Sequence, residues 1–84
     1  MKEQRFRYVI HQEQDHEVFQ ALCDRLEAMY PRIKKTGVYR DMDADETTEY
    51  VLDGANITVR SDFWIDDVYI LSDVPLPVEK FKVA

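Results

Sequence analysis

The segment from Asp41 to Glu46 is the part of the sequence that most suggests metal chemistry. Carboxylates at its first, third and fifth positions match the beginning of an EF-hand calcium loop. The match then ends, because the sixth position needs glycine and holds Glu46, and the twelfth needs a bidentate glutamate and holds Leu52. The flanking residues also alternate as strands do, whereas an EF-hand loop joins two helices. We therefore expect a solvated loop here and no metal site.

Two histidines and one cysteine are the other residues that could carry chemistry. His11 and His16 lie close in the sequence, but neither has a carboxylate or cysteine at a spacing typical of a ligand set. Cys23 falls in the middle of a predicted helix beside Asp24, whereas a nucleophilic cysteine needs a nearby cation or a helix N-terminus. We expect two surface histidines and a cysteine at the flank of the core.

The sequence also lacks the motifs of common enzyme classes. With only Gly37 and Gly54, no loop can cradle a phosphate with successive backbone amides, and no P-loop, Rossmann, G-x-S-x-G or H-E-x-x-H motif is present. Asp66 and Asp67 could serve as an acid and a base, but adjacent residues of a strand point to opposite faces. The prediction is a protein that is not an enzyme and binds no cofactor.

Charge is unevenly distributed along the 84 residues, whose net charge is −6. Residues 1–40 hold eight basic and six acidic residues, whereas residues 41–84 hold three basic and eleven acidic ones. An acidic half repels phosphates, which makes direct nucleic-acid binding unlikely, and it favours a basic protein partner. No apolar run reaches the roughly 20 residues that span a bilayer. A single cysteine in so small a chain favours the cytoplasm over secretion.

Hydrophobic periodicity predicts one helix and five strands in a single domain over residues 1–84. Residues 15–30 place apolar side chains at helical spacing, with Asp15 as the N-cap and Pro31 ending the helix. Alternation predicts strands at 4–11, 33–40, 46–53, 55–61 and 63–72, with turns at Asp53–Gly54 and Ser61–Asp62. Residues 73–84 form an extended tail or a short final helix. The predicted class is α+β, in the order β-α-β-β-β-β, with one helix packed on one face of an antiparallel sheet.

The predicted strand 63–72 is the most apolar one, yet Asp66 and Asp67 interrupt it after Phe63, Trp64 and Ile65. One of the two carboxylates would then face the helix-covered side unless the strand is bulged or lies at the sheet edge. Charges on an edge strand prevent aggregation between sheets, which is our first interpretation. An acidic and aromatic patch that binds a basic partner is the second.

These observations favour a protein-binding module of the inhibitor, immunity or antitoxin type, which would block a basic partner such as a nuclease. The predicted partner-binding residues are Asp41, Asp43, Asp45, Glu46, Glu49, Asp62, Trp64, Asp66, Asp67 and Tyr69, with Tyr39 and Tyr50 as further aromatic candidates. Two alternatives stay open. A sheet with exposed edges could form a homodimer. Less favoured is a metal-binding protein that uses the histidines and the acidic loop.

Overall fold

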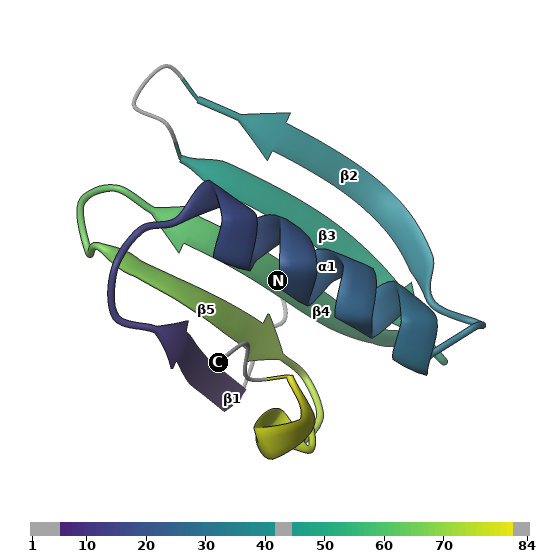
Figure 1. The fold of residues 1–84 in the computed structure, drawn as a ribbon. Helices are drawn as coiled ribbons and strands as arrows, with labels where there is room; N and C mark the ends of the chain where they lie inside the picture. The colour runs from purple at the N-terminus through teal and green to yellow at the C-terminus, as the bar shows by residue number, and fades with distance from the viewer. Residues whose placement is uncertain (1–5, 42–44, 82–84) are drawn as a thin grey trace.

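A five-stranded antiparallel sheet, covered on one face by a single helix, makes up the computed structural model, which describes residues 6–41 and 45–81 (Figure 1). The sheet has the strand order β1-β5-β4-β3-β2. This confirms the α+β class and the predicted element order. The elements are β1 (Phe6–His11), α1 (His16–Met29), β2 (Lys34–Arg40), β3 (Glu46–Leu52), β4 (Ala55–Asp62), β5 (Asp67–Ser72) and the 3-10 turn η1 (Val78–Lys80).

Helix α1 begins and ends where the sequence predicts. The Asp15 side chain accepts hydrogen bonds from the backbone N–H groups of Glu17, at 2.9 Å, and Val18, at 3.2 Å. These bonds satisfy two of the donors that the first helical turn leaves unpaired. Tyr30 is the C-cap, and Pro31 follows it. The residues of α1 that are buried against the sheet are Phe19, Leu22, Cys23 and Leu26.

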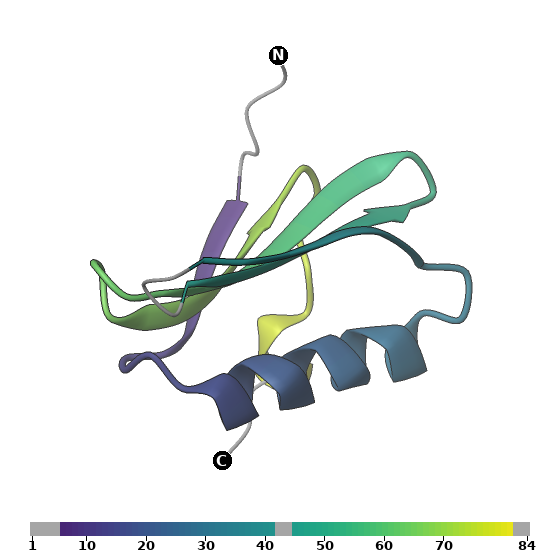
Figure 2. The same cartoon turned by 90° about the horizontal axis from the view of Figure 1, so that it is seen from above.

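The core lies between α1 and the middle strands, as the edge-on view in Figure 2 shows. Alternate residues of β3, β4 and β5 point toward the helix, and cross-strand pairs such as Tyr50 with Ile57 and Val59 with Ile70 form its floor. Cys23 is 2% exposed and belongs to this core. The prediction that it lies only at the flank was therefore wrong, because the helix turns a wider face toward the sheet than the apolar stripe suggested.

The turn between β3 and β4 confirms the predicted hairpin. Asp53 has φ 50° and Gly54 has φ 84°, so both central residues take the left-handed conformation that a type I′ turn requires. Aspartate tolerates this region better than most residues, and glycine adopts it freely.

The second hairpin differs from the prediction. Strand β4 continues through Asp62, so Ser61 and Asp62 are strand residues and not a turn. Residues 63–66 form the turn, and β5 begins only at Asp67. Strand β5 also lies between β1 and β4, so the prediction that its carboxylates protect a sheet edge was wrong. The run from Phe63 to Ile65 is predicted as a strand because it is apolar, but its three large side chains are exposed in the turn.

Strand β2 is an edge strand that the helix does not cover. All of its residues except Gly37 are exposed, and its register with β3 shifts between Lys35 and Gly37. The Tyr39 ring lies over Gly37, where a Cβ atom would come within 2.7 Å of the tyrosine hydroxyl, so a larger residue at this position would require the exposed ring to move. A bulge and charged side chains are both devices that protect an edge from pairing with other chains.

The chain after β5 returns to the core. Residues 73–74 form a bend, η1 forms one turn, and Phe81 is fully buried with its ring 6.4 Å from that of Tyr30. The sequence predicts an extended tail or a short final helix over residues 73–84, and within the described residues the chain forms the single turn η1 (Val78–Lys80). Phe81 belongs to the same core cluster as the helix residues, so this segment is part of the folded unit.

Replacing Phe81 with alanine tests whether this segment holds the fold together. We expect Phe81→Ala to lower the free energy of unfolding by about 3–5 kcal/mol, because it removes a fully buried ring and leaves a cavity. Glu79→Ala, an exposed change in the same turn, should stay within about 0.5 kcal/mol of the wild type. Urea denaturation followed by circular dichroism measures both, and equal midpoints for the two variants would contradict this placement of Phe81.

Alkaline pH should destabilise the fold, because two tyrosine hydroxyls and one cysteine thiol have pKa values raised by burial. Burial, followed by the hydrogen bond from its hydroxyl to Glu27 at 2.8 Å, raises the pKa of Tyr50 well above its usual range. Burial also raises the pKa values of Tyr69 and Cys23. The folded state therefore keeps protons that the unfolded chain releases. The contribution of these groups to the free energy of unfolding is complete below the pKa values that they have in the unfolded chain. As pH rises above those values, the free energy of unfolding falls by up to about 1.4 kcal/mol per pH unit for each proton.

The variant Tyr50→Phe isolates one of these groups. It removes one titrating hydroxyl, so the loss of stability with pH should be shallower than in the wild type, by about half a proton at pH 10 and nearly one proton at pH 11. Urea midpoints measured across this pH range give both slopes. An identical pH dependence in the two proteins would show that Tyr50 titrates as freely in the folded state as in the unfolded state.

Candidate functional site

Three connections meet at one end of the sheet, which we call the loop end: the β1–α1 connection, the β2–β3 connection and the β4–β5 turn (Figure 1). Direct contacts join them. The backbone N–H of Gln14 donates to Oδ1 of Asp66 at 2.9 Å, and the backbone N–H of Phe63 donates to Oδ1 of Asp45 at 2.6 Å. The loop end is therefore held together by carboxylates that accept from the backbone of a neighbouring connection.

The β4–β5 turn, residues 63–66, is the hairpin tip. Oδ1 of Asp62 accepts from the backbone N–H groups of Trp64, at 2.9 Å, and Ile65, at 3.1 Å. The backbone N–H of Asp66 donates to the Asp62 carbonyl at 2.8 Å, and Asp66 has φ 61°. Together with the contact from Asp45 to Phe63, these bonds give every backbone N–H of the tip a partner, and they determine its conformation.

The tip exposes three large apolar side chains. Trp64 is 78% exposed, Phe63 is 51% exposed and Ile65 is 52% exposed. The rings of Phe63 and Trp64 meet edge to face, with their centroids 5.6 Å apart. Folding gains little from side chains that stay in water, so three of them in a row on a rigid turn mark a surface suited to binding.

An ionic cluster supports the tip on the sheet face opposite α1. Asp62 and Asp67 are directly paired across β4 and β5, where like charges destabilise a sheet. Two arginines offset this repulsion. Arg60 lies 3.5 Å from Asp62 and 3.7 Å from Asp45, and Arg7 lies 3.7 Å from Asp67. Four of these side chains are half-buried or buried, and the two arginines offset most of the charge of the three carboxylates beneath the tip.

Tyr69 lies beneath this cluster. It is 4% exposed, and the Arg7 guanidinium lies 4.5 Å from the centre of its ring, within the range of a cation–π contact. A side chain so deeply covered offers a partner almost no surface, so Tyr69 serves the packing of the loop end.

A pocket of about 360 Å³ lies on the helix side of the same end. Glu46, 7% exposed, forms its most buried charge, with both carboxylate oxygens 2.8 Å from Nδ1 of His16 and Oε1 3.2 Å from Nε of Arg40. Ser61 is paired with Glu46 across β3 and β4, and its buried hydroxyl has no hydrogen-bond partner in the described part of the chain. The pocket is lined by Gln14, His16, Arg40, Asp41, Asp45, Glu46 and Ser61.

The pocket contains a histidine whose Nδ1 contacts a buried carboxylate, a contact that fixes the orientation of the imidazole ring. The prediction of two merely superficial histidines was therefore incomplete: His16 is half exposed but paired with Glu46, from 30 residues away. Among residues 6–41 and 45–81, no three histidine, cysteine or acidic side chains are grouped to hold a metal ion. Two carboxylates of the pocket are instead paired with arginines of the protein itself, Glu46 with Arg40 and Asp45 with Arg60.

The ten predicted partner-binding residues differ in their placement. Asp41, Trp64 and Asp66 are exposed, and Asp45, Glu49 and Asp67 are half-buried. Glu46, Asp62 and Tyr69 are buried, each with less than a tenth of its surface accessible. Asp43 lies outside the described residues. All of the described ones except Glu49 belong to the loop end, and Glu49 lies in the middle of β3.

Sequence reasoning did not identify Phe63 and Ile65 as surface residues, nor the group formed by His16, Arg40 and Ser61. A usable signal existed for the tip. In a turn, an aspartate side chain commonly accepts hydrogen bonds from the backbone N–H groups two and three positions after it. Asp62 directly precedes the apolar run. No local signal existed for the pocket, because its members come from four separate elements.

The chain matches no protein-family model, no curated protein and no solved structure. No helix in the described residues has the length and apolar character needed to cross a membrane.

Asp62 can be changed to separate its two roles. Asp62→Ala removes the acceptor for Trp64 and Ile65, so we expect faster hydrogen exchange at these two amides, together with a loss of about 1–2 kcal/mol of stability. Asp62→Asn keeps an acceptor oxygen but removes the charge, and it should preserve the protection of both amides. NMR-detected exchange distinguishes the two variants, and equal protection in the wild type and Asp62→Ala would refute this role.

Proposed function

We propose that the protein is a non-enzymatic binding module whose loop end docks on a basic surface of a partner protein, as a small inhibitor, immunity protein or antitoxin does. The observation that carries the proposal is the hairpin tip: three exposed apolar side chains, held rigidly and surrounded by carboxylates. Aromatic residues supply much of the energy of protein interfaces, and charge complementarity supplies the speed and orientation of the encounter.

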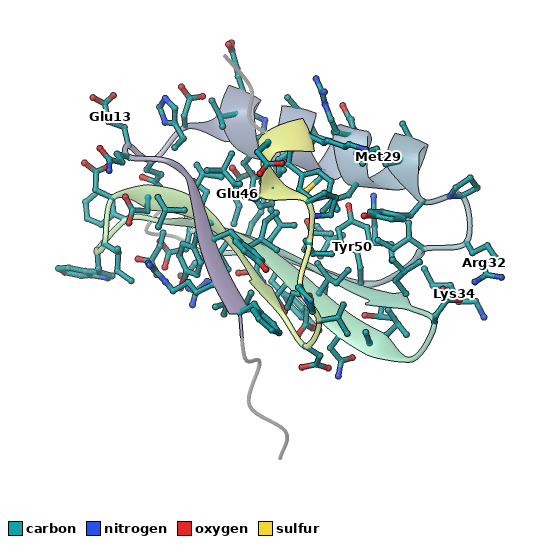
Figure 3. The ribbon with its side chains drawn as sticks, turned by 90° about the horizontal axis from the view of Figure 1, so that it is seen from below. Glu13, Met29, Arg32, Lys34, Glu46 and Tyr50 are labelled. Carbon is teal, nitrogen blue, oxygen red and sulfur yellow. The ribbon has the colours of Figure 1, made fainter. Side chains whose placement is uncertain are left out.

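The charge of the molecule supports this orientation. The loop end contains Glu13, Asp15, Asp41, Asp66 and Asp67, in addition to Asp45, Glu46 and Asp62, and these acids outnumber its arginines, which are Arg7, Arg40 and Arg60. Arg32 and Lys34 lie at the opposite end of the molecule, while Glu13 lies at the loop end, as Figure 3 shows. A molecule with a net charge of −6 and this polarity would approach a basic surface with the loop end first.

The structure weighs against the alternative of a homodimer formed through β2. Its outer edge is unpaired by the described strands, which would permit strand addition. However, β2 contains Lys34, Lys35 and Arg40 and no acid, so antiparallel pairing with a second β2 would bring like charges together. We therefore favour a basic partner over a second copy.

We expect binding to take place in the cytoplasm. This compartment is reducing, and Cys23 stays a thiol there.

Removing charge from the loop end without changing its shape tests the proposal. The variant replaces three exposed acids with their amides: Glu13→Gln, Asp41→Asn and Asp66→Asn. We expect a tagged wild-type protein to retain a basic protein from native cell lysate at low salt and to lose much of it at high salt, while the variant retains on the order of tenfold less at low salt.

A matched control removes the same charge from other surfaces. It carries the exposed changes Asp24→Asn, Asp53→Asn and Glu79→Gln. This control should retain the partner as the wild type does, because the local field at the loop end is unchanged. Equal losses in both variants would mean that only net charge matters, and retention that ignores both charge and salt would contradict a basic partner.

A further inference from the structure

We propose that the side chains of Phe63, Trp64 and Ile65 are the anchor of the interface, inserting as a unit into an apolar recess that is rimmed by lysine or arginine side chains of the partner protein. This inference rests on the proposed function and deepens it, because it names the part of the loop end that enters the partner and the chemistry of the surface that receives it.

The tip is preorganised for insertion. A flexible loop would lose conformational entropy on binding, but the four backbone N–H groups of residues 63–66 already donate to Asp45 or Asp62. Asp66 keeps a positive φ, which is costly for a residue other than glycine and persists only where the surroundings determine it. The edge-to-face contact of Phe63 and Trp64 further restricts both rings.

The carboxylates around the tip define the partner. Asp66 is exposed in the tip itself, and Glu13 and Asp41 are exposed on the two neighbouring connections. An apolar recess with an acidic or neutral rim would leave these charges desolvated or repelled, whereas a rim of lysine and arginine side chains would pair with them. The occupant that fits is therefore a folded basic protein with an apolar recess.

Other occupants fit less well. Most membrane surfaces that bind peripheral proteins carry anionic lipids, which the same carboxylates would repel. A second copy of this chain presents the same acids at its own loop end, and its basic strand β2 already has Lys35 and Arg40 in ion pairs with Glu27 and Glu46. These two occupants remain distinguishable outcomes of the experiment below.

The protein supplies its own reporter, because Trp64 is its only tryptophan. Protein labelled with 5-fluorotryptophan gives a single ¹⁹F resonance, from the residue proposed to enter the partner. The labelled protein is mixed with clarified lysate of the cells in which it is native. We expect the resonance to broaden and lose most of its intensity at low salt, and to recover largely at high salt.

Competition makes the result specific to the tip. Excess unlabelled wild-type protein should restore the resonance, and so should Val74→Ser, which changes an exposed apolar residue outside the tip. Unlabelled Trp64→Ser should fail to restore it. Because Trp64 is 78% exposed, this substitution removes the anchor without disturbing the core.

Several results would overturn the anchor. Restoration by Trp64→Ser as effective as by the wild type would mean that the tip does not contribute to binding. Loss of the resonance with phosphatidylcholine vesicles alone would identify a membrane, and loss on raising the concentration of the protein alone would identify a second copy. Loss that high salt leaves unchanged would exclude the basic rim.

The experiment also separates the anchor from the proposed function. If the tagged protein retains a basic, salt-sensitive partner while the ¹⁹F resonance stays sharp, the charged surface binds without the tip, and only the anchor is wrong. If neither experiment detects a partner, both proposals fail together.

Discussion

One helix of fourteen residues has to cover a sheet of five strands, and the rest of the structure depends on this constraint. A helix of that length is about 21 Å long and about 10 Å wide, whereas neighbouring strands lie about 4.8 Å apart. Apolar burial is therefore concentrated on the middle strands, where Tyr50, Ile57 and Val59 lie under α1. Phe81 returns from the end of the chain to extend that cover. The edge strand β2 and the loop end lie beyond the reach of the core.

Polar contacts stabilise the loop end, whereas apolar packing stabilises the region beneath the helix. Asp45 and Asp66 accept from backbone N–H groups of neighbouring connections, and Asp62 accepts from the turn that follows it. Arg60 offsets the charge of Asp45 and Asp62. Ionised acceptors form stronger hydrogen bonds than neutral ones, so a small region can be made rigid without a core of its own. The acids that give the sequence its unusual charge are in large part structural here. Because these acids fix the backbone of the hairpin tip, its three apolar side chains stay exposed.

Alternation along β3 explains why this end has two different faces. Asp45 and Glu46 are consecutive, so one reaches Arg60 on the open face of the sheet while the other reaches His16 and Arg40 on the helix side. A single acidic stretch of sequence thus supports both the hairpin tip and the pocket. This economy is consistent with a protein whose surface, more than its interior, performs its function.

The sequence by itself determined the helix, its Asp15 cap, the Asp53–Gly54 hairpin and the α+β class, because each of these depends on residues that are close along the chain. Only the tertiary structure decided the rest. It placed Phe63–Ile65 in a turn, since the hydrogen bonds to Asp62 and Asp45 outweigh the strand preference of three apolar residues. Asp45 lies 18 positions before Phe63, whose N–H group donates to it. It buried Glu46 beside His16, and it placed β5 inside the sheet. Contacts between distant segments leave no periodic signal in a sequence, so patterning alone could not reveal which acids are structural and which apolar residues are exposed.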